Sequence, residues 1–542
     1  MHSDTKAKLD HSIRSSTYIM FQASRFIRTG LNQVAKQSKR MYRPQEILKN
    51  LKNPELLQTK GYINGKYIGG ASEKTFEVID PAFEPHSEAK LTDVASMELA
   101  DYETAIDVAH QTFDEFRKTT GRYRSELLMN LFGLMRENQE DLAKLIVLEN
   151  GKPYSDALGE VIYASLFFQW YAEEAPRVAG SILPSGIQTN RILSIKQPVG
   201  VCGILTPWNF PSAMITRKLG AAIAAGCTAV IKPASETPLS ALALGYLLKK
   251  AGFPDGVINV LATEVNNVPA VGKLICEHPK VKKVSFTGST NVGKLLMTQS
   301  ASTLKKISLE LGGNAPLIVF DDADIDKAVD GAILSKFRSS GQTCVCANRI
   351  FVQESVYDEF SKRFVDKLSR VVKLGKGLET GVTHGPLIHQ KSLGKVTSHI
   401  EDAITAGAKI LFGGKKAGHV GHNFHELTVL GDVPPSAIIL KEETFGPVAP
   451  LIKFKTEDDV ISMANTSDVG LAAYFFSKNV DRIFKVAEAI DAGMVGVNTG
   501  AISEAAMPFG GVKESGFGRE GSIFGVNDYT VIKSIVLGDL KK

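Results

Sequence analysis

Hydrophobic and polar positions alternate with two different periods along the middle of the chain, from Val199 onward. Short apolar runs of strand length are separated by longer segments with the apolar spacing of helices. The pattern predicts strands at 199–205, 228–232, 256–261 and 281–286, and helices at 213–225, 239–251, near 271 and at 291–300. Strands joined by such helices form a parallel, doubly wound sheet, which binds ligands at the carboxyl ends of its strands. Lys232 and the turn from Gly288 to Gly293 are predicted at those ends.

A second alternating α/β region begins near Leu309 and continues beyond residue 500. Helices are predicted there at 325–335, 357–371 and 480–490. Segments 181–197 and 529–537 alternate like strands but have no obvious partner of their own. Exposed strand edges of this kind pair with another subunit, so we expect a homo-oligomer.

The part of the chain before the first sheet carries two local signals. Asn64-Gly65 predicts the turn of a strand pair around 62–68, and the folded body is expected to begin near residue 57. One long helix is predicted from Arg122 to Asn150, where Gly151 ends it and Pro153 follows.

Composition narrows the class of protein. The 542 residues are 44% hydrophobic and 22% charged, as in a large globular protein of several domains. The longest apolar stretch, Leu219 to Ile231, falls well short of the roughly 18 residues that a membrane span requires. Five cysteines are too few and too irregularly spaced for a disulfide scaffold, which indicates a reducing compartment.

The positive charge is concentrated at the N-terminus. Residues 1–45 contain nine Lys/Arg and two Asp, whereas the remainder is close to neutral, so no nucleic-acid-binding surface is predicted. From His11 to Gln45 there is no acidic residue, and apolar and basic residues are interleaved, which is typical of a mitochondrial presequence. Asp4 and Asp10 are atypical of presequences, and they leave open the alternative of a basic tail on a cytoplasmic protein.

Three short segments carry candidate chemistry. The segment from Gly288 to Leu295 follows a strand and opens a helix, where backbone amides could hold a phosphate. It differs from a nucleotide-triphosphate P-loop at Leu295, where a Ser or Thr would be needed for magnesium, so a P-loop NTPase is the alternative class. Cys344 and Cys346 lie in a polar turn suited to a reactive thiol. Glu310 is embedded in apolar residues and glycines, where desolvation would raise its pKa toward that of a general base.

Six motifs in order resemble the aldehyde dehydrogenase superfamily over residues 57–540. They are Thr206-Pro207-Trp208-Asn209-Phe210-Pro211, Lys232-Pro233, Phe286-Thr287-Gly288-Ser289, Leu309-Glu310-Leu311-Gly312-Gly313, Gly341-Gln342-Thr343-Cys344 and Glu443-Thr444-Phe445-Gly446-Pro447. The resemblance implies an α/β fold with a Rossmann-type dinucleotide-binding domain at 57–179 and 199–308. It further implies an α/β catalytic domain at 309–520 and a small β oligomerisation element at 180–198 and 521–540, in a dimer or tetramer.

The resemblance also implies a role for each catalytic residue. Cys344 would attack the aldehyde, and the Asn209 amide with the Cys344 backbone N–H would stabilise the oxyanion of the thiohemiacetal. Glu310 would activate the water that hydrolyses the thioester. Lys218 and Glu520 match positions linked to proton movement, with a structural ion pair as the alternative. A structural member without activity would be expected to lack Cys344, Glu310 or Asn209, and all three are present.

The cofactor implied is NADP or NAD. The residues that match the family's cofactor site are Thr206, Pro207, Trp208, Lys232, Ser235, Gly288, Ser289, Gly293, Glu443 and Phe445. Ser235 is small and neutral where an acid would repel a 2′-phosphate, so NADP should be accepted. Glu236, one place later, leaves the preference between the two cofactors open.

Within the superfamily the chain is most similar to the succinate-semialdehyde dehydrogenases, which complete the degradation of 4-aminobutanoate (GABA). Such a substrate carries a carboxylate opposite its aldehyde, and Arg217, Arg338 and Ser503 match the positions that would bind it. Residues 505–507 differ from the expected sequence, so a glutarate-semialdehyde or broad-specificity aldehyde dehydrogenase is the alternative.

Two further groups of residues are candidates for redox or metal chemistry. Cys346 lies two residues from Cys344, and in an extended segment the two thiols would face the same way, within reach of a reversible disulfide. The alternative is a cysteine that only packs. His419, His422 and His425 lie in a predicted loop without a carboxylate or cysteine at ligand spacing, so no metal is assigned.

Overall fold

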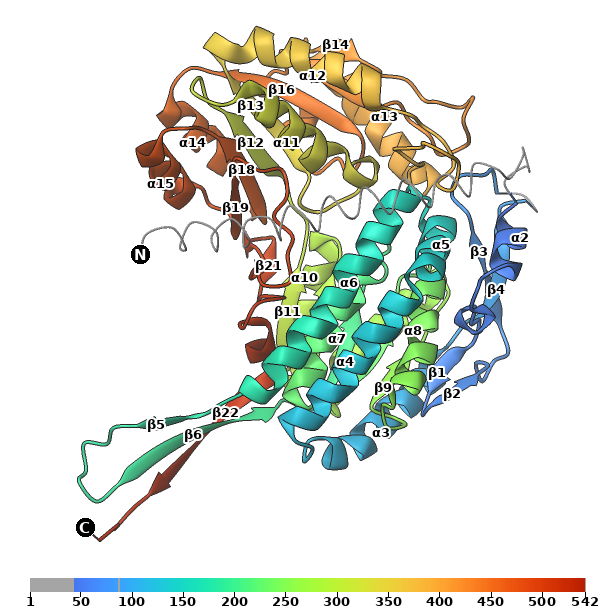
Figure 1. Cartoon of the computed structure of the whole chain (residues 1–542), viewed down its shortest axis with the longest axis vertical. Helices are drawn as coiled ribbons and strands as arrows, with labels where there is room; N and C mark the ends of the chain where they lie inside the picture. Colours follow the sequence, from blue (N-terminus) through green and yellow to red (C-terminus); the bar gives the residue numbers. More distant parts are fainter. Residues whose placement is uncertain (1–42, 86–87, 542) are drawn as a thin grey trace, which may run out of the picture.

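The computed structural model describes residues 43–85 and 88–541. Figure 1 shows two α/β bodies, one above the other, with a narrow β arm that projects from the lower body. The predicted presequence lies almost entirely outside the described residues. The folded body begins earlier than predicted, because α2 (Pro44–Lys49) and the turn at Pro54–Leu56 bury Leu48, Leu51 and Leu56 against the first domain.

The lower body contains an eight-stranded sheet in the order β2-β1-β9-β8-β7-β10-β11-β21. Its strands are β1 (Gly61–Ile63), β2 (Lys66–Ile68), β7 (Val201–Leu205), β8 (Thr228–Lys232), β9 (Ile258–Val260), β10 (Val281–Thr287), β11 (Lys306–Glu310) and β21 (Gly516–Phe517). The five central strands are parallel, while β1 and β21 join the two sides antiparallel. The predicted doubly wound sheet is confirmed. Its strand order reverses between β7 and β10, the place where such sheets bind ligands.

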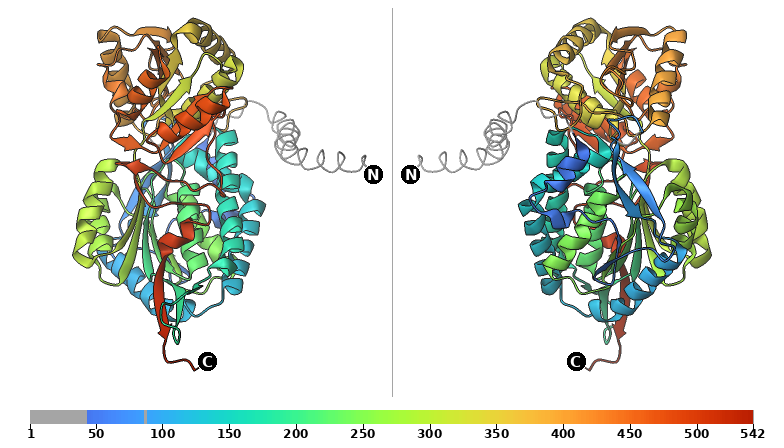
Figure 2. Two further views of the ribbon diagram at one scale, coloured as in Figure 1. Left: turned by 90° about the vertical axis from the view of Figure 1, so that its left-hand side faces the viewer. Right: turned by 90° about the vertical axis from the view of Figure 1, so that its right-hand side faces the viewer.

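Helices cover both faces of this sheet and form two separate cores (Figure 2). One face carries α3 (Leu99–Phe116), α9 (Val268–Glu277) and α10 (Thr290–Ser300). The other carries α4 (Gly121–Glu137), α5 (Gln139–Asn150), α6 (Tyr154–Glu174), α7 (Ala213–Ala225) and α8 (Pro238–Ala251). Strands β7 and β8 are buried along their whole length, which explains their continuous apolar sequences.

The prediction of one helix from Arg122 to Asn150 is wrong. The chain forms α4 and α5, which are separated at Asn138. The Asn138 side chain donates to the Leu134 carbonyl at 2.8 Å and accepts from the Asn53 side chain at 2.8 Å, so it ends α4 and anchors the N-terminal segment. Gly151 ends α5 in the left-handed conformation (φ 86°), as predicted.

The upper body contains a seven-stranded sheet in the order β14-β15-β16-β13-β12-β18-β19. Its strands are β12 (Ala315–Val319), β13 (Ala347–Gln353), β14 (Lys409–Phe412), β15 (Thr428–Gly431), β16 (Val448–Phe454), β18 (Ala472–Phe476) and β19 (Met494–Val497). The accompanying helices are α11 (Ile325–Phe337), α12 (Tyr357–Val371), α13 (Gln390–Thr405), α14 (Glu457–Asn465) and α15 (Val480–Ala489). The three helices predicted here are confirmed. Two small strand pairs lie outside the two large sheets. They are β3 (Thr75–Ile79) with β4 (Lys90–Ala95) and β17 (Val469–Gly470) with β20 (Val512–Lys513).

The two strand-like segments without an obvious partner pair with each other. β5 (Ser181–Leu183), β6 (Arg191–Pro198) and β22 (Thr530–Leu537) form the antiparallel arm in Figure 1. Apolar side chains remain exposed on this arm, where the side chain of Ile182 is 76% exposed and that of Ile532 is 72% exposed.

The structure differs from two predicted domain boundaries. Residues 525–529 pack against α7 and do not join the arm. Strand β11 crosses the predicted boundary at residue 309 and belongs to the first sheet. No helix among residues 43–85 and 88–541 is long and apolar enough to cross a membrane.

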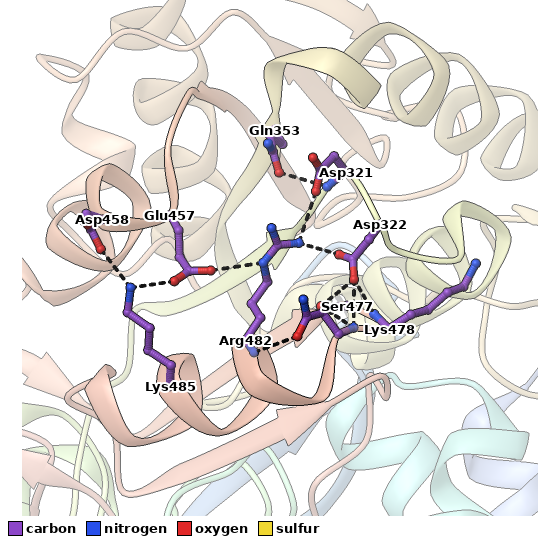
Figure 3. Close-up of polar contacts among 10 residues, drawn as sticks. Asp321, Asp322, Gln353, Glu457, Asp458, Ser477, Lys478, Arg482 and Lys485 are labelled. Atoms are coloured by element: carbon purple, nitrogen blue, oxygen red, sulfur yellow. Dashed lines mark hydrogen bonds and ion pairs between the residues drawn. The ribbon is translucent and has the colours of Figure 1, made fainter.

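A charged network holds the carboxyl edge of the upper sheet (Figure 3). The Arg482 guanidinium lies 2.6 Å from Asp322 and 3.1 Å from Asp321, and it donates to Glu457 at 3.0 Å. Asp322 also accepts from the backbone N–H groups of Lys478 and Asn479 at 2.8 Å each. One arginine therefore joins the segment after β12 to both α14 and α15.

We expect Arg482→Met to lower the free energy of unfolding by about 1–3 kcal/mol, because it leaves three carboxylates without their shared donor. The urea-induced unfolding of the variant measures this loss. The matched control is Arg363→Met, since Arg363 pairs with Asp326 and Glu359 on an exposed surface and its loss should change the midpoint little. Equal midpoints for Arg482→Met and the parent would contradict the assignment.

Candidate active site

The loop before Cys344 has an unusual backbone. Ser339, Ser340 and Gly341 follow α11 with φ values of 49°, 55° and 76°, three successive left-handed residues. For each serine such a conformation costs about 1–3 kcal/mol. A side chain at Gly341 would lie 2.2 Å from the Gly446 carbonyl, so only glycine fits. Strain of this kind persists where the surroundings fix it, and the Ser340 hydroxyl donates to the Gly385 carbonyl at 2.8 Å.

Cys344 is buried and unpaired at the end of this loop. Burial raises the pKa of its thiol to about 12, against the opposing effect of the Arg217 charge. The expectation of an extended segment from Cys344 to Cys346 is wrong, because the Cys346 N–H donates to the Thr343 carbonyl at 3.0 Å and closes a turn. The Cys346 thiol lies 3.5 Å from the Lys336 carbonyl. The two thiols are therefore not presented side by side from one strand face.

Glu310 is the last residue of β11 and has an unusual environment. Its side chain is buried, and neither carboxylate oxygen has a hydrogen-bond partner among the described residues. Burial, with a further contribution from Glu520, raises its pKa well above the ordinary value. The chain then passes through Gly313, where a side chain would lie 2.3 Å from the Cys344 carbonyl. The structure thus brings the carboxylate and the nucleophile loop together from different sheets.

Asn209 comes from the loop after β7, at the point where the strand order reverses. Its Nδ2 donates to the Gln342 carbonyl at 3.2 Å, and its Oδ1 accepts from the Phe210 N–H at 3.1 Å. The amide is thereby held beside the cysteine loop, with one N–H free for a second acceptor. Cys344, Glu310 and Asn209 are brought to one place by three separate segments.

Arg217, Lys218 and Glu520 form a buried ion cluster next to Glu310. Arg217 lies 2.6 Å from Glu520 and its guanidinium stacks 3.8 Å from the centre of the Phe509 ring. Lys218 also contacts the Glu520 carboxylate. Arg217 was expected to face a substrate carboxylate, and the structure shows its charge already shared with Glu520.

Arg338 has no ion pair within the described part of the chain and is half-buried. Its guanidinium lies 5.2 Å from the centre of the ring of Phe210, which directly follows Asn209. Arg338 itself lies at the start of the strained loop. Ser503 lies half-buried in the segment after β19. Of the two arginines, Arg338 is the one whose charge is available.

Most of the residues expected to bind a dinucleotide lie at the carboxyl ends of β7, β8 and β10, whereas Glu443 and Phe445 come from the upper body, in the segment before β16. Trp208 and Phe445 meet edge to face, with ring centres 5.5 Å apart. Glu443 accepts from the Gly313 N–H at 3.2 Å, and burial raises the pKa of Glu443 to about 7. Pro207 precedes Trp208, and Ser289 precedes α10, whose Gly293 packs against Leu311. The Trp208–Phe445 contact and the Gly313–Glu443 hydrogen bond thus bring expected cofactor residues from different segments together.

NADP or NAD fits this donor set. The Lys232 ammonium is buried and donates only to the Pro233 carbonyl at 2.9 Å among the residues described. Burial lowers its pKa to about 8, although Glu236 acts in the opposite direction. Thr206 Oγ1 is buried without a partner in residues 43–85 and 88–541, and Ser235 donates to Thr263 at 2.7 Å. A buried cation and an unsatisfied hydroxyl suit the phosphate and ribose groups of such a cofactor.

Comparison with known proteins settles the family. The sequence profile described as "Aldehyde dehydrogenase family" matches residues 67–535. The chain belongs to the aldehyde dehydrogenase family. It is 53% identical to succinate-semialdehyde dehydrogenase [NADP(+)] of Saccharomyces cerevisiae, over 90% of this chain and 97% of that protein. It is 50% identical to glutarate-semialdehyde dehydrogenase of Pseudomonas putida, over 90% of this chain and 99% of that protein. The crystal structure of succinate-semialdehyde dehydrogenase from Burkholderia pseudomallei matches with a TM-score of 0.88 and 49% identity, over 90% of this chain and 100% of that one.

This aldehyde dehydrogenase also contains site residues that the sequence did not suggest. Lys152 and Glu160 form a buried ion pair at 2.6 Å, directly behind Asn209. Lys152 lies between Gly151 and Pro153, two residues that predict the end of a helix, and nothing in the local sequence indicates its contact with Asn209. His419, His422 and His425 are not part of a metal cluster, and no group of acids, histidines or cysteines among the described residues could hold a metal ion.

The pKa values of Cys344 and Glu310 predict how activity depends on pH. Because burial raises the pKa of both groups, the thiolate and the carboxylate become more abundant as pH rises. We expect kcat/KM to increase from pH 6 to pH 9, by up to about tenfold per unit, because a thiolate fraction grows tenfold per unit below its pKa. Initial rates across this range measure the profile. A profile that falls with pH would contradict the assignment.

The role of Glu310 is tested by Glu310→Gln, which keeps the shape of the side chain and removes its basicity. We expect kcat to fall by about 10²–10⁴-fold, the usual contribution of a general base. Steady-state rates with an aldehyde substrate measure the loss. The control is Glu514→Gln, which changes an exposed ion pair with Lys294 and should leave kcat unchanged. Glu443→Gln is unsuitable as a control, because Glu443 is one of the residues expected to bind the cofactor.

Proposed function

We propose that the protein oxidises succinate semialdehyde to succinate with NADP or NAD, the last step of 4-aminobutanoate (GABA) degradation. The observation that carries the proposal is Arg338, a half-buried arginine without an ion pair in the described chain, next to the nucleophile loop. An unneutralised guanidinium in such a place suits a planar carboxylate. The semialdehyde has its carboxylate at the end opposite the reacting carbonyl.

The chain's own residues account for the covalent steps. The Cys344 thiol gives up its proton to solvent, and the sulfur adds to the aldehyde carbon. The free N–H of Asn209 and the Cys344 backbone N–H stabilise the resulting oxyanion. When bound, NADP or NAD supplies the acceptor for the hydride that leaves this carbon. The Glu310 carboxylate then takes a proton from the water that attacks the thioester, and the leaving Cys344 thiolate takes up a proton as succinate is released.

Arg338 is assigned the substrate carboxylate, and Ser503 a supporting hydrogen bond. Arg217 supports the same pocket from behind, through Phe509 and Glu520. Lys218 is proposed to keep Glu520 ionised beside Glu310, and so to tune the general base. Glutarate semialdehyde, one methylene longer, is the second candidate substrate, because the glutarate-semialdehyde dehydrogenase of Pseudomonas putida is 50% identical to this chain, as is the succinate-semialdehyde dehydrogenase of Escherichia coli.

The test compares succinate semialdehyde with butanal, its uncharged analogue. We expect Arg338→Met to raise KM for the semialdehyde by about 10- to 100-fold, since a charge-assisted pair contributes about 1.5–3 kcal/mol. KM for butanal should change little. Initial rates of cofactor reduction at varied substrate concentration measure both. Equal effects on the two substrates would remove the carboxylate role of Arg338 and leave a broad-specificity aldehyde dehydrogenase.

Cofactor choice is assigned to Lys232 and Ser235. Ser235→Glu would place a carboxylate where the 2′-phosphate binds, so we expect KM for NADP to rise by at least about tenfold and KM for NAD to change far less. Rates with each cofactor at saturating aldehyde measure the switch. Ser302→Glu, at an exposed position beyond the C-terminal end of α10, controls for an added charge on the same domain. An equal rise for both cofactors would contradict the assignment.

A redox role of Cys344 and Cys346 remains a proposal. Two thiols and hydrogen peroxide would give one disulfide and two waters, after the turn between the cysteines opens. We expect peroxide to inactivate the enzyme and dithiothreitol to restore it, while Cys346→Ala should respond differently to the oxidant. An unchanged oxidant response in Cys346→Ala would leave Cys346 a packing residue.

The remaining proposals concern the assembly and location of the enzyme. The exposed apolar side chains of β5, β6 and β22 support a homo-oligomer, a dimer or tetramer, in which a second copy covers the arm. Residues 1–45 are proposed to direct the protein to the mitochondrial matrix, with a cytoplasmic protein as the alternative. The partner in catalysis is a small semialdehyde, and no nucleic-acid or membrane partner is proposed.

A further inference from the structure

Lys152 and Glu160 form an ion pair that the reaction steps above do not use. Their side chains are 1% and 0% exposed, and the Lys152 Nζ lies 2.6 Å from the Glu160 carboxylate. Burying two charges is costly, and a pair of well-packed apolar residues would often be as stable or more stable. Stability alone therefore does not explain why two charged residues are buried at this place.

The contacts of the pair converge on the oxyanion donor. Lys152 donates a second hydrogen bond to the backbone carbonyl of Asn209 at 2.6 Å. Glu160 accepts from the N–H of Ser212 at 2.9 Å and from that of Ala213 at 3.3 Å. The pair thus contacts the loop at Asn209 and again at Ser212, three residues later, directly before α7 begins.

Two neighbouring contacts act on the same loop. Asn150 donates to the Trp208 carbonyl at 3.0 Å, so the corner after α5 holds two successive carbonyls. The Lys152 ammonium also lies 4.0 Å from the centre of the Phe210 ring, the ring on which Arg338 stacks. Both backbone and side-chain contacts therefore fix the residues on either side of Asn209.

Helix capping alone does not explain the lysine. Glu149 supplies an internal comparison, because it caps α8 as Glu160 caps α7, accepting from the N–H groups of Leu239 at 2.6 Å and Ser240 at 2.9 Å. Glu149 is equally buried and has no lysine partner among the described residues, and burial raises its pKa to about 8. A buried glutamate can thus cap a helix here without a cation. The additional element at Glu160 is the bond from Lys152 to Asn209.

We propose that Lys152 and Glu160 are positioning residues that hold the Asn209 amide at the place where the oxyanion develops. The inference rests on the proposed function, because it assigns the pair to that oxyanion. The side-chain N–H of Asn209 that is not bonded to Gln342 must point at the reacting oxygen, and a displacement of about 1 Å at such a donor can cost about a hundredfold in rate. Fixing the main chain of Asn209 limits that displacement.

The test is a double-mutant cycle measured on the full-length enzyme. Lys152→Met removes the donor at similar length, and Glu160→Gln, which retains an acceptor for α7, is the second variant if Lys152→Met does not fold. We expect kcat to fall about 10- to 100-fold in either variant, with KM for the aldehyde and cofactor changed by less than about threefold, because a missing oxyanion donor costs about 10²–10³ in kcat. In the Asn209→Ala background, the same substitutions should reduce kcat no further.

The matched control is Glu149→Gln, which weakens the cap of α8. It should lower the thermal midpoint as Glu160→Gln does, with kcat unchanged. Independent effects of Glu160→Gln and Asn209→Ala, whose fold-losses multiply, would overturn the inference, as would an unchanged kcat in both pair variants. A failure of the proposed function would appear separately, as a parent enzyme that does not oxidise the semialdehyde, and the cycle can then be measured with butanal.

Discussion

The buried carboxylate of Glu520 is the group on which the arrangement of the active site depends. It is 4% exposed and lies between Arg217 and Lys218, two successive cations of α7. Removing one member of such a cluster leaves a buried charge unpaired, at a cost of about 3–5 kcal/mol. The segment that carries Glu520 comes after the second sheet and returns to the first, so this cluster attaches the returning segment to α7. Its neighbour β21 pairs with β11 at Glu310.

The same cluster sets the electrostatic environment of Glu310. Glu520 adds to the burial that raises the pKa of Glu310, while Arg217 and Lys218 act in the opposite direction. Glu310 itself has no hydrogen-bond partner among the described residues, so its proton affinity is governed by desolvation and by these neighbours. One set of charges therefore both attaches the returning segment to α7 and sets the environment of Glu310. Arg338 lies outside the cluster and has no ion pair in the described part of the chain.

The sequence predicted those features of the fold and site that depend on local pattern. The strands and helices from β7 to α10 were predicted within a few residues, because buried parallel strands and amphipathic helices have distinct apolar spacing. The motifs around Asn209, Glu310 and Cys344 identified the residues that the structure brings together. The strand partners β6 and β22 were both recognised, although their pairing with each other was not.

Features that depend on tertiary contacts were not predictable in this way. Asn138 breaks a helix through a bond to Asn53, which is distant in sequence. The loop before Cys344 contains three successive left-handed residues. At Gly341, the nearby Gly446 carbonyl leaves no room for a side chain. Arg217 matches a substrate-binding position, yet its partner Glu520 lies some three hundred residues later. The sequence around Lys152 does not indicate its proposed role, because that role depends on a hydrogen bond to the carbonyl of Asn209, which is distant in sequence.

The most direct test of the account is identification of the covalent intermediate. Glu310→Gln enzyme mixed with succinate semialdehyde and NADP, and quenched with acid, should carry a succinyl group on the tryptic peptide that contains Cys344, as detected by mass spectrometry. Cys344→Ala in the same background should carry none. A succinyl group on another residue, or turnover by Cys344→Ala enzyme, would contradict the assignment of the nucleophile and with it the roles of Glu310 and Asn209.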